Sequence, residues 1–147
     1  MNDLIIDATT NKIFLTLIKN TKNIYTSKHE NCKNNFDKLI ILIDDLLEKN
    51  KLITKDLNRI YVNRGPGSFA GIRNSLSIAK GFHIAKNIDY FCFSFFDFIN
   101  LENSIKKQIV MNLSLLSQYH NIKYEEIPEL CSKYKIKKNL IKPLYLS

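Results

Sequence analysis

The most informative segment of this 147-residue chain is Asn63-Arg64-Gly65-Pro66-Gly67-Ser68-Phe69-Ala70-Gly71-Ile72-Arg73, which holds three of its four glycines. A short run rich in β-branched and aromatic residues, 57–62, comes directly before it. Apolar residues at helical spacing follow it between Ile72 and Ala85. The pattern therefore predicts a strand, a tight glycine turn and a helix.

Glycine-rich turns that carry chemistry need residues that this stretch lacks. A P-loop requires Lys and then Ser or Thr after its last glycine, whereas Ile72 and Arg73 follow Gly71. The spacing G-x-G-x-x-x-G is one residue too long for a dinucleotide fingerprint. Ser68 lacks the flanking glycines of a nucleophile elbow. Two interpretations are left: an anion site at the helix N-terminus or, favoured on physical grounds, a turn capped by Ser68 itself.

The residues on either side predict a sheet and a further helix. Three short apolar runs, 4–7, 12–19 and 24–27, are separated by turn residues and predict an antiparallel meander. Apolar residues at intervals of three and four predict a helix over 36–47. Ile41 and Leu42 fall outside its core stripe, which is typical either of ordinary exposure or of a partner contact. Another strand is expected at 90–93.

Composition limits the classes of protein that fit. The formal net charge is +8, which favours weak attraction to polyanions, although a compositional bias accounts for the many lysines equally well. Three widely spaced cysteines indicate neither a zinc site nor a disulfide framework, and hence a reducing compartment. The three histidines lack metal-ligand spacing, so we expect no metal site. Without a leader or a membrane-length apolar run, the expected location is cytoplasmic.

The stretch 63–73, here called the signature stretch, also carries a family resemblance. Gly65 to Arg73, followed by Ala79-Lys80-Gly81, resembles the GPGSFTGLR…AKG motif of the TsaB (YeaZ) family, the dimerisation subunit of the bacterial machinery that makes threonylcarbamoyladenosine in tRNA. Ala70 stands where the family has threonine, which removes one hydroxyl from the turn. The matching turn residues are Gly65, Pro66, Gly67, Ser68, Phe69, Gly71 and Arg73.

The resemblance implies an α/β fold of the actin and Hsp70 type, a ribonuclease-H-like lobe with a mixed sheet, packed helices and a reduced C-terminal remnant lobe. The expected domains are an actin-like N-terminal lobe, 1–100, and a truncated C-terminal lobe, 101–147. In the second we expect strands at 108–113 and 122–127 and a helix from Pro128 to Tyr134. The closing residues 142–147 resemble the family's P-x-Y-L-R ending, which indicates an internal deletion.

The family's role implies a noncatalytic dimerisation and activating subunit of the complex that transfers threonylcarbamoyl to the adenosine beside the tRNA anticodon. The implied partners are a homologous catalytic subunit (TsaD-like) in a heterodimer, an ATPase subunit (TsaE-like) in a larger complex, and tRNA through that complex. Self-pairing of the isolated chain is left open. We expect no cofactor on this chain alone, ATP and metal on the catalytic partner, and no membrane association.

The two helices of the first lobe pack, in the family, against the equivalent pair of a second subunit. His29 does not align with the family's histidine ahead of the first helix, where Asn35 stands instead. Transferred to this sequence, the implied partner interface is Asn35, Lys38, Ile41, Leu42, Asp45, Gly71, Asn74, Ser75 and Ile78.

Two other classes of function stay open. An enzyme, either an actin-like ATP-dependent phosphotransferase or a peptidase, would use Asp7 with the glycine turn. Asp7-Ala8-Thr9-Thr10 resembles the family's D-T-S-T but has no glycine to admit phosphate, so we interpret Asp7 as a turn residue. Direct RNA binding is the second class, with Arg73 and Lys80 on one helix face as candidate phosphate contacts.

Overall fold

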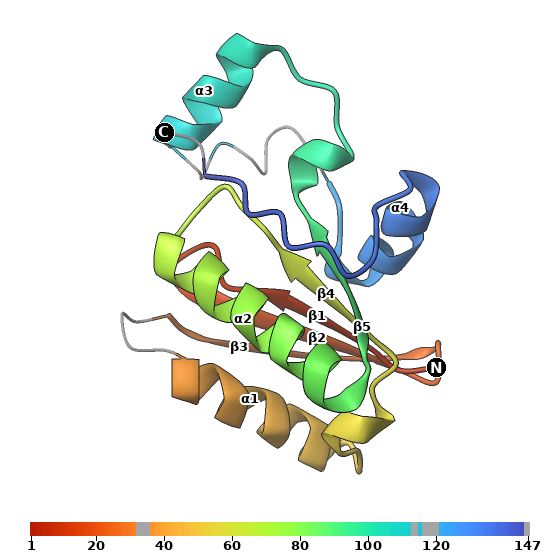
Figure 1. The fold of residues 1–147 in the computed structure, drawn as a ribbon. Helices are drawn as coiled ribbons and strands as arrows, with labels where there is room; N and C mark the ends of the chain where they lie inside the picture. The colour runs from red at the N-terminus through yellow and green to blue at the C-terminus, as the bar shows by residue number, and fades with distance from the viewer. Residues whose placement is uncertain (32–35, 113–114, 116–120, 146–147) are drawn as a thin grey trace.

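The computed structural model describes residues 1–31, 36–112, 115 and 121–145, and its centre is a five-stranded sheet of order β3-β2-β1-β4-β5 (Figure 1). β1 (Asp3–Asp7), β2 (Lys12–Lys19) and β3 (Asn23–Glu30) form the predicted antiparallel meander. β4 (Arg59–Asn63) pairs in parallel with β1, and β5 (Asp89–Phe93) pairs in parallel with β4. The predicted α/β class with a mixed sheet is confirmed.

Two helices lie side by side across one face of this sheet (Figure 1). They are α1 (Phe36–Lys49) and α2 (Phe69–Lys86), which match the two helices predicted from apolar spacing. Leu39 and Ile43 of α1 and Ile72 and Ala79 of α2 are buried against the strands. The main core therefore lies between the sheet and these two helices, and their opposite sides face outward.

The other face of the sheet has a second core, which contains Ile5, Tyr61 and Phe93 from the strands. Strand residues alternate between the two faces, so Leu4 and Ile6 enter the first core while Ile5 enters the second. The covering segments are η2 (Phe95–Asp97), η4 (Tyr124–Glu126) and α4 (Ile127–Lys133). Segments from beyond residue 100 thus pack on the sheet, while the division into lobes 1–100 and 101–147 stays a prediction.

Two strands predicted after residue 100 are wrong. Residues 103–111 form α3 (Asn103–Met111), since Ile105 and Ile109 are four residues apart and Ile109 is fully buried on the helix. The predicted strand at 122–127 is instead η4 and the start of α4, because only Ile127 of this stretch is buried and Glu125 and Glu126 are exposed. The helix expected from Pro128 is confirmed, with Pro128 in its first turn.

Parallel pairing brings the carboxyl ends of β1, β4 and β5 to one edge of the sheet, where Asp7, Asn63 and Phe93 end their strands. The glycine turn starts there. A Cβ added at Gly71 would collide with the carbonyl oxygen of Ala8, and one at Gly67 with the carbonyl oxygen of Thr9. These two glycines are therefore required by the close approach of the β1–β2 turn.

Replacing Gly71 with alanine should lower the free energy of unfolding by about 1–3 kcal/mol, because the new methyl group overlaps the Ala8 backbone. Gly81 lies in the same helix with nothing within 4 Å of an added Cβ, so Gly81→Ala should stabilise the chain by about 0.5–1 kcal/mol. Urea denaturation of both variants measures the difference. Equal effects would contradict the steric role of Gly71.

Candidate functional site

The glycine turn and the β1–β2 turn bind each other at the carboxyl edge of the sheet. The backbone N–H of Ser68 donates to the carbonyl oxygen of Thr9 at 2.7 Å. The Ser68 hydroxyl oxygen accepts the N–H of Gly71 at 3.2 Å, which caps the N-terminus of α2. The predicted self-capped turn is confirmed.

Asp7 lies beside this turn and is buried. Its Oδ1 accepts hydrogen bonds from the backbone N–H of Thr9 at 3.0 Å and from the Thr9 hydroxyl at 2.7 Å. Its Oδ2 accepts the hydroxyl of Tyr124 at 2.6 Å. The interpretation of Asp7 as a turn residue is confirmed, since its carboxylate binds its own turn.

Tyr124 is a site residue that sequence reasoning missed. It lies 117 residues from Asp7 along the chain, in a stretch expected to be a strand, so no local pattern pointed to it. Burial, with the Asp7 carboxylate next to it, raises the pKa of the Tyr124 phenol far above its ordinary value. The phenol therefore stays a hydrogen-bond donor to Asp7 at physiological pH.

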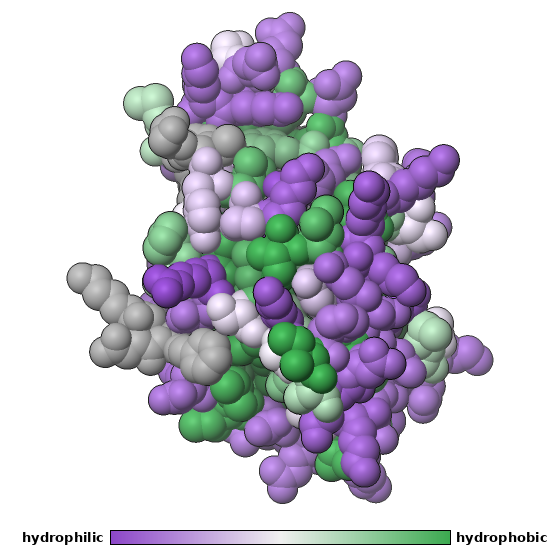
Figure 2. Space-filling model, viewed as in Figure 1, coloured by the Kyte–Doolittle hydropathy of each residue, from purple (hydrophilic) through white to green (hydrophobic). Residues whose placement is uncertain are grey.

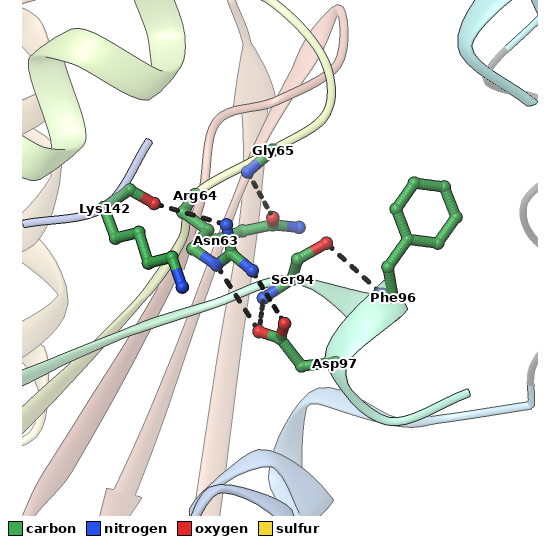
Figure 3. Close-up of polar contacts among 7 residues, drawn as sticks. All are labelled: Asn63, Arg64, Gly65, Ser94, Phe96, Asp97 and Lys142. Carbon is green, nitrogen blue, oxygen red and sulfur yellow. Dashed lines mark hydrogen bonds and ion pairs between the residues drawn. The ribbon is translucent and has the colours of Figure 1, made fainter. Parts of the chain in front are cut away.

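Arg64, the second residue of the signature stretch, links three segments (Figure 3). Its Nη2 donates to Oδ1 of Asp97 at 2.7 Å, and its Nη1 donates to the carbonyl oxygen of Lys142 at 3.4 Å. Oδ2 of Asp97 also accepts the backbone N–H of Ser94 at 2.8 Å, which completes a capping box at the start of η2. The side chains of Arg64 and Asp97 are only 10% and 20% exposed, so this pair is a largely buried structural contact.

A cavity of about 270 Å³ opens beside the Arg64–Asp97 pair. Three lysines line it, Lys135, Lys137 and Lys142, together with the buried Cys92. Burial raises the pKa of the Cys92 thiol to about 11, so this thiol is neutral near pH 7. The charged groups of the cavity are thus the Arg64 guanidinium, the three lysines and the Asp97 carboxylate.

The predicted interface residues fall into three groups. Ile41 is 57% exposed, Asp45 is exposed, and Lys38, Leu42 and Asn74 are half-buried. Gly71, Ser75 and Ile78 are buried within the chain, where the Ser75 hydroxyl bonds the carbonyl oxygen of Gly71 at 2.8 Å. Asn35 lies outside the described residues.

The turn residues are placed as follows. Gly65 and Pro66 are buried and Gly67 and Ser68 are half-buried, while Phe69 and Arg73 are exposed. Arg73 and Lys80 both lie on the outer side of α2. Within the described residues we find no group of three His, Cys, Asp or Glu side chains placed to hold a metal ion. Nor does any helix in that part of the chain have the length and apolarity needed to cross a membrane.

The mixed sheet, its two helices on one face and the self-capped glycine turn define an α/β protein of the actin-like, ribonuclease-H-like class. The family model for TsaD, tRNA N6-adenosine threonylcarbamoyltransferase, matches residues 22–114. The chain belongs to this family, and the relatives that it matches carry the names TsaB and YeaZ.

Individual relatives agree with this assignment. The chain is 33% identical over 92 residues to the tRNA threonylcarbamoyladenosine biosynthesis protein TsaB of Buchnera aphidicola subsp. Schizaphis graminum (strain Sg), covering 62% of this chain and 44% of that protein. It is 31% identical over 70 residues to TsaB of Buchnera aphidicola subsp. Baizongia pistaciae (strain Bp), covering 47% and 32%. The matches thus span less than half the length of each relative.

A solved structure shows the same fold. YeaZ from Pseudomonas aeruginosa superposes with a TM-score of 0.59 at 20% identity, over 63% of this chain and 43% of that one.

Tyr124→Phe should lower the free energy of unfolding by about 1–3 kcal/mol, because it leaves an oxygen of the buried Asp7 carboxylate without its hydroxyl donor. Tyr25→Phe is the matched control. Tyr25 is exposed on β3, so removing its hydroxyl should change the free energy of unfolding by less than about 0.5 kcal/mol. Chemical denaturation followed by circular dichroism compares them. Equal stability of the two variants would show that the Asp7–Tyr124 contact contributes nothing.

Proposed function

We propose that this chain is a noncatalytic subunit that docks a homologous catalytic subunit through the outer faces of α1 and α2, within the machinery that forms threonylcarbamoyladenosine in tRNA. The observation that carries the proposal is the exposed apolar surface on these two helices. Ile41 of α1 is 57% exposed and Ile84 of α2 is 74% exposed. Figure 2 shows apolar surface among polar residues on the side that the helices present.

The charges of the two helices also favour a homologous partner. The exposed acids of α1 include Asp37, Asp44, Asp45 and Glu48. The outer side of α2 carries the exposed cations Arg73 and Lys80. When two related helix pairs meet around a two-fold axis, α1 of each subunit can lie against α2 of the other. That arrangement would bring opposite charges together around the apolar residues.

Contacts at the glycine turn support a noncatalytic role. The carboxylate of Asp7 is held by Thr9 and Tyr124, and the Ser68 N–H is directed to Thr9. The Ala8 backbone fills the space next to Gly71. An ATP-dependent phosphotransferase acting alone would need these groups for phosphate and metal, so the contacts argue against that alternative.

The names of the relatives state a role in threonylcarbamoyladenosine biosynthesis, which supports placing the chain in that machinery. In this proposal ATP and metal are bound by the TsaD-like partner, a TsaE-like ATPase joins the larger complex, and tRNA is engaged by the assembly. Such a role would place the protein in the cytoplasm.

The test is to purify the chain alone and with a TsaD-like subunit from the same genome. Association is measured by light scattering after gel filtration, together with ATP hydrolysis and tRNA modification. Modification by the mixture only supports the proposal. ATP hydrolysis by the isolated chain would instead favour the enzyme, and a stable homodimer that excludes the TsaD-like subunit would overturn the heterodimer.

Ile41→Lys should weaken association with the TsaD-like subunit at least about tenfold, because it places a desolvated charge in the apolar part of the interface. Ile53→Lys is the control, since Ile53 is 56% exposed but lies outside α1 and α2, directly before η1 (Thr54–Asp56). Isothermal titration calorimetry gives both affinities, and circular dichroism confirms folding. Unchanged affinity of Ile41→Lys would remove this residue from the interface.

A further inference from the structure

The segment 133–142, here called the lysine segment, carries five lysines: Lys133, Lys135, Lys137, Lys138 and Lys142. No acidic residue occurs in it, and Glu129 is the last acid of the whole sequence. All five lysines are exposed. The segment is therefore a local concentration of positive charge within a chain of formal net charge +8.

Backbone contacts hold the lysine segment and the residues just after it against β5, the last strand of the sheet, and against Arg64 of the signature stretch. Lys138 forms an antiparallel bridge with Phe91 of β5. Asn139 donates its N–H to the carbonyl oxygen of Tyr90 at 2.7 Å, and its side chain accepts the N–H of Tyr90 at 3.0 Å. Just beyond the segment, Leu144 donates to the carbonyl oxygen of Arg64 at 2.8 Å. The lysines thus extend from an ordered backbone.

Little negative charge compensates these lysines. Lys138 forms an ion pair with Asp89 at 3.6 Å, but in the part of the chain that the structure describes the other four have no carboxylate within ion-pair distance. Lys135, Lys137 and Lys142 line the 270 Å³ cavity whose one carboxylate, Asp97, already binds Arg64. Figure 3 shows the Lys142 side chain beside the Arg64 guanidinium, and both residues line this cavity. This surface is suited to an anionic ligand.

We propose that the lysine segment binds the phosphodiester backbone of RNA. The proposal rests on the proposed function, in which the assembly acts on tRNA, and it assigns part of the RNA contact to this chain. Residues 135–142 would span at most roughly 25 Å if fully extended, and the positive φ at Lys135 and Asn139 makes the segment shorter, so its charges can reach a few neighbouring phosphates. Lysine interacts with phosphate as a mobile point charge, so such a surface needs no fixed base sequence.

Exposed aromatic residues favour RNA over an acidic protein as the ligand. Tyr134 lies within the segment and Tyr145 follows it, and both are more than 40% exposed. Their rings are held in place by Phe98 and Phe69, at centroid distances of 5.6 Å and 4.9 Å. Unpaired bases stack on aromatic side chains of this kind next to cationic groups. A single-stranded RNA loop therefore fits the segment better than a duplex does.

The experiment compares two triple variants with the same change in charge. Lys135→Gln, Lys137→Gln and Lys142→Gln remove the cavity lysines, and Lys22→Gln, Lys51→Gln and Lys55→Gln remove three exposed lysines outside α1 and α2. Binding of a fluorescein-labelled anticodon stem-loop RNA to the full chain is followed by fluorescence anisotropy between about 50 and 200 mM salt. Thermal unfolding confirms that both variants are folded.

We expect the cavity triple to weaken RNA binding at least about tenfold and to lower the slope of log K against log salt by roughly 2, as three lost phosphate contacts predict. The control triple should change the affinity by less than about threefold, because distant charges are screened. If both triple variants weaken RNA binding equally, the loss of affinity comes from the change in net charge alone, and the proposal is overturned. Polyglutamate that competes as well as unlabelled RNA would overturn it in favour of an acidic protein.

Association with the TsaD-like subunit is measured for the same variants. The cavity triple leaves α1 and α2 unchanged, so we expect normal association. Loss of RNA binding with intact association supports the lysine segment as the RNA contact. Intact RNA binding with normal association would refute the segment and leave the docking proposal standing.

Discussion

The structure depends on the close approach of two turns at the carboxyl edge of the sheet. The glycine turn lies against the β1–β2 turn, with the Ser68 N–H bonded to the Thr9 carbonyl oxygen at 2.7 Å. Gly67 and Gly71 have no room for a side chain because the Thr9 and Ala8 backbones occupy that space. This contact fixes the start of α2, and α2 in turn positions α1 and the core beneath them.

The same contact influences what the chain can do. The groups that a nucleotide would need at this edge are already bonded: Asp7 to Thr9 and Tyr124, and Ser68 to Thr9. The outer sides of α1 and α2 carry apolar and charged side chains that the fold itself does not use. We therefore assign the proposed function to these helix faces. Most of the signature stretch is explained by packing.

Residues beyond position 100 bind Asp7 and Arg64 and fill part of the second core. The Tyr124 hydroxyl donates to the carboxylate of Asp7. The Lys142 carbonyl oxygen accepts a hydrogen bond from the Arg64 side chain, and the Leu144 N–H donates to the Arg64 carbonyl oxygen. Ile127 and Cys131 fill the core on the second face of the sheet. The match to the family model ends at residue 114, yet residues beyond it bind directly to the signature residues and hold the lysines of the segment 133–142 in a defined position.

Local sequence patterns predict the five strands, the two sheet-covering helices and the self-capped turn, because apolar spacing and capping chemistry act between residues close in the chain. The sequence also predicted Asp7 as a turn residue. Three features emerged from the folded chain: residues 103–111 form a helix, Ser75 and Ile78 are buried, and Tyr124 binds Asp7. Those outcomes depend on which helix faces pack inward and on contacts between residues far apart in the chain, and local sequence patterns do not fix either.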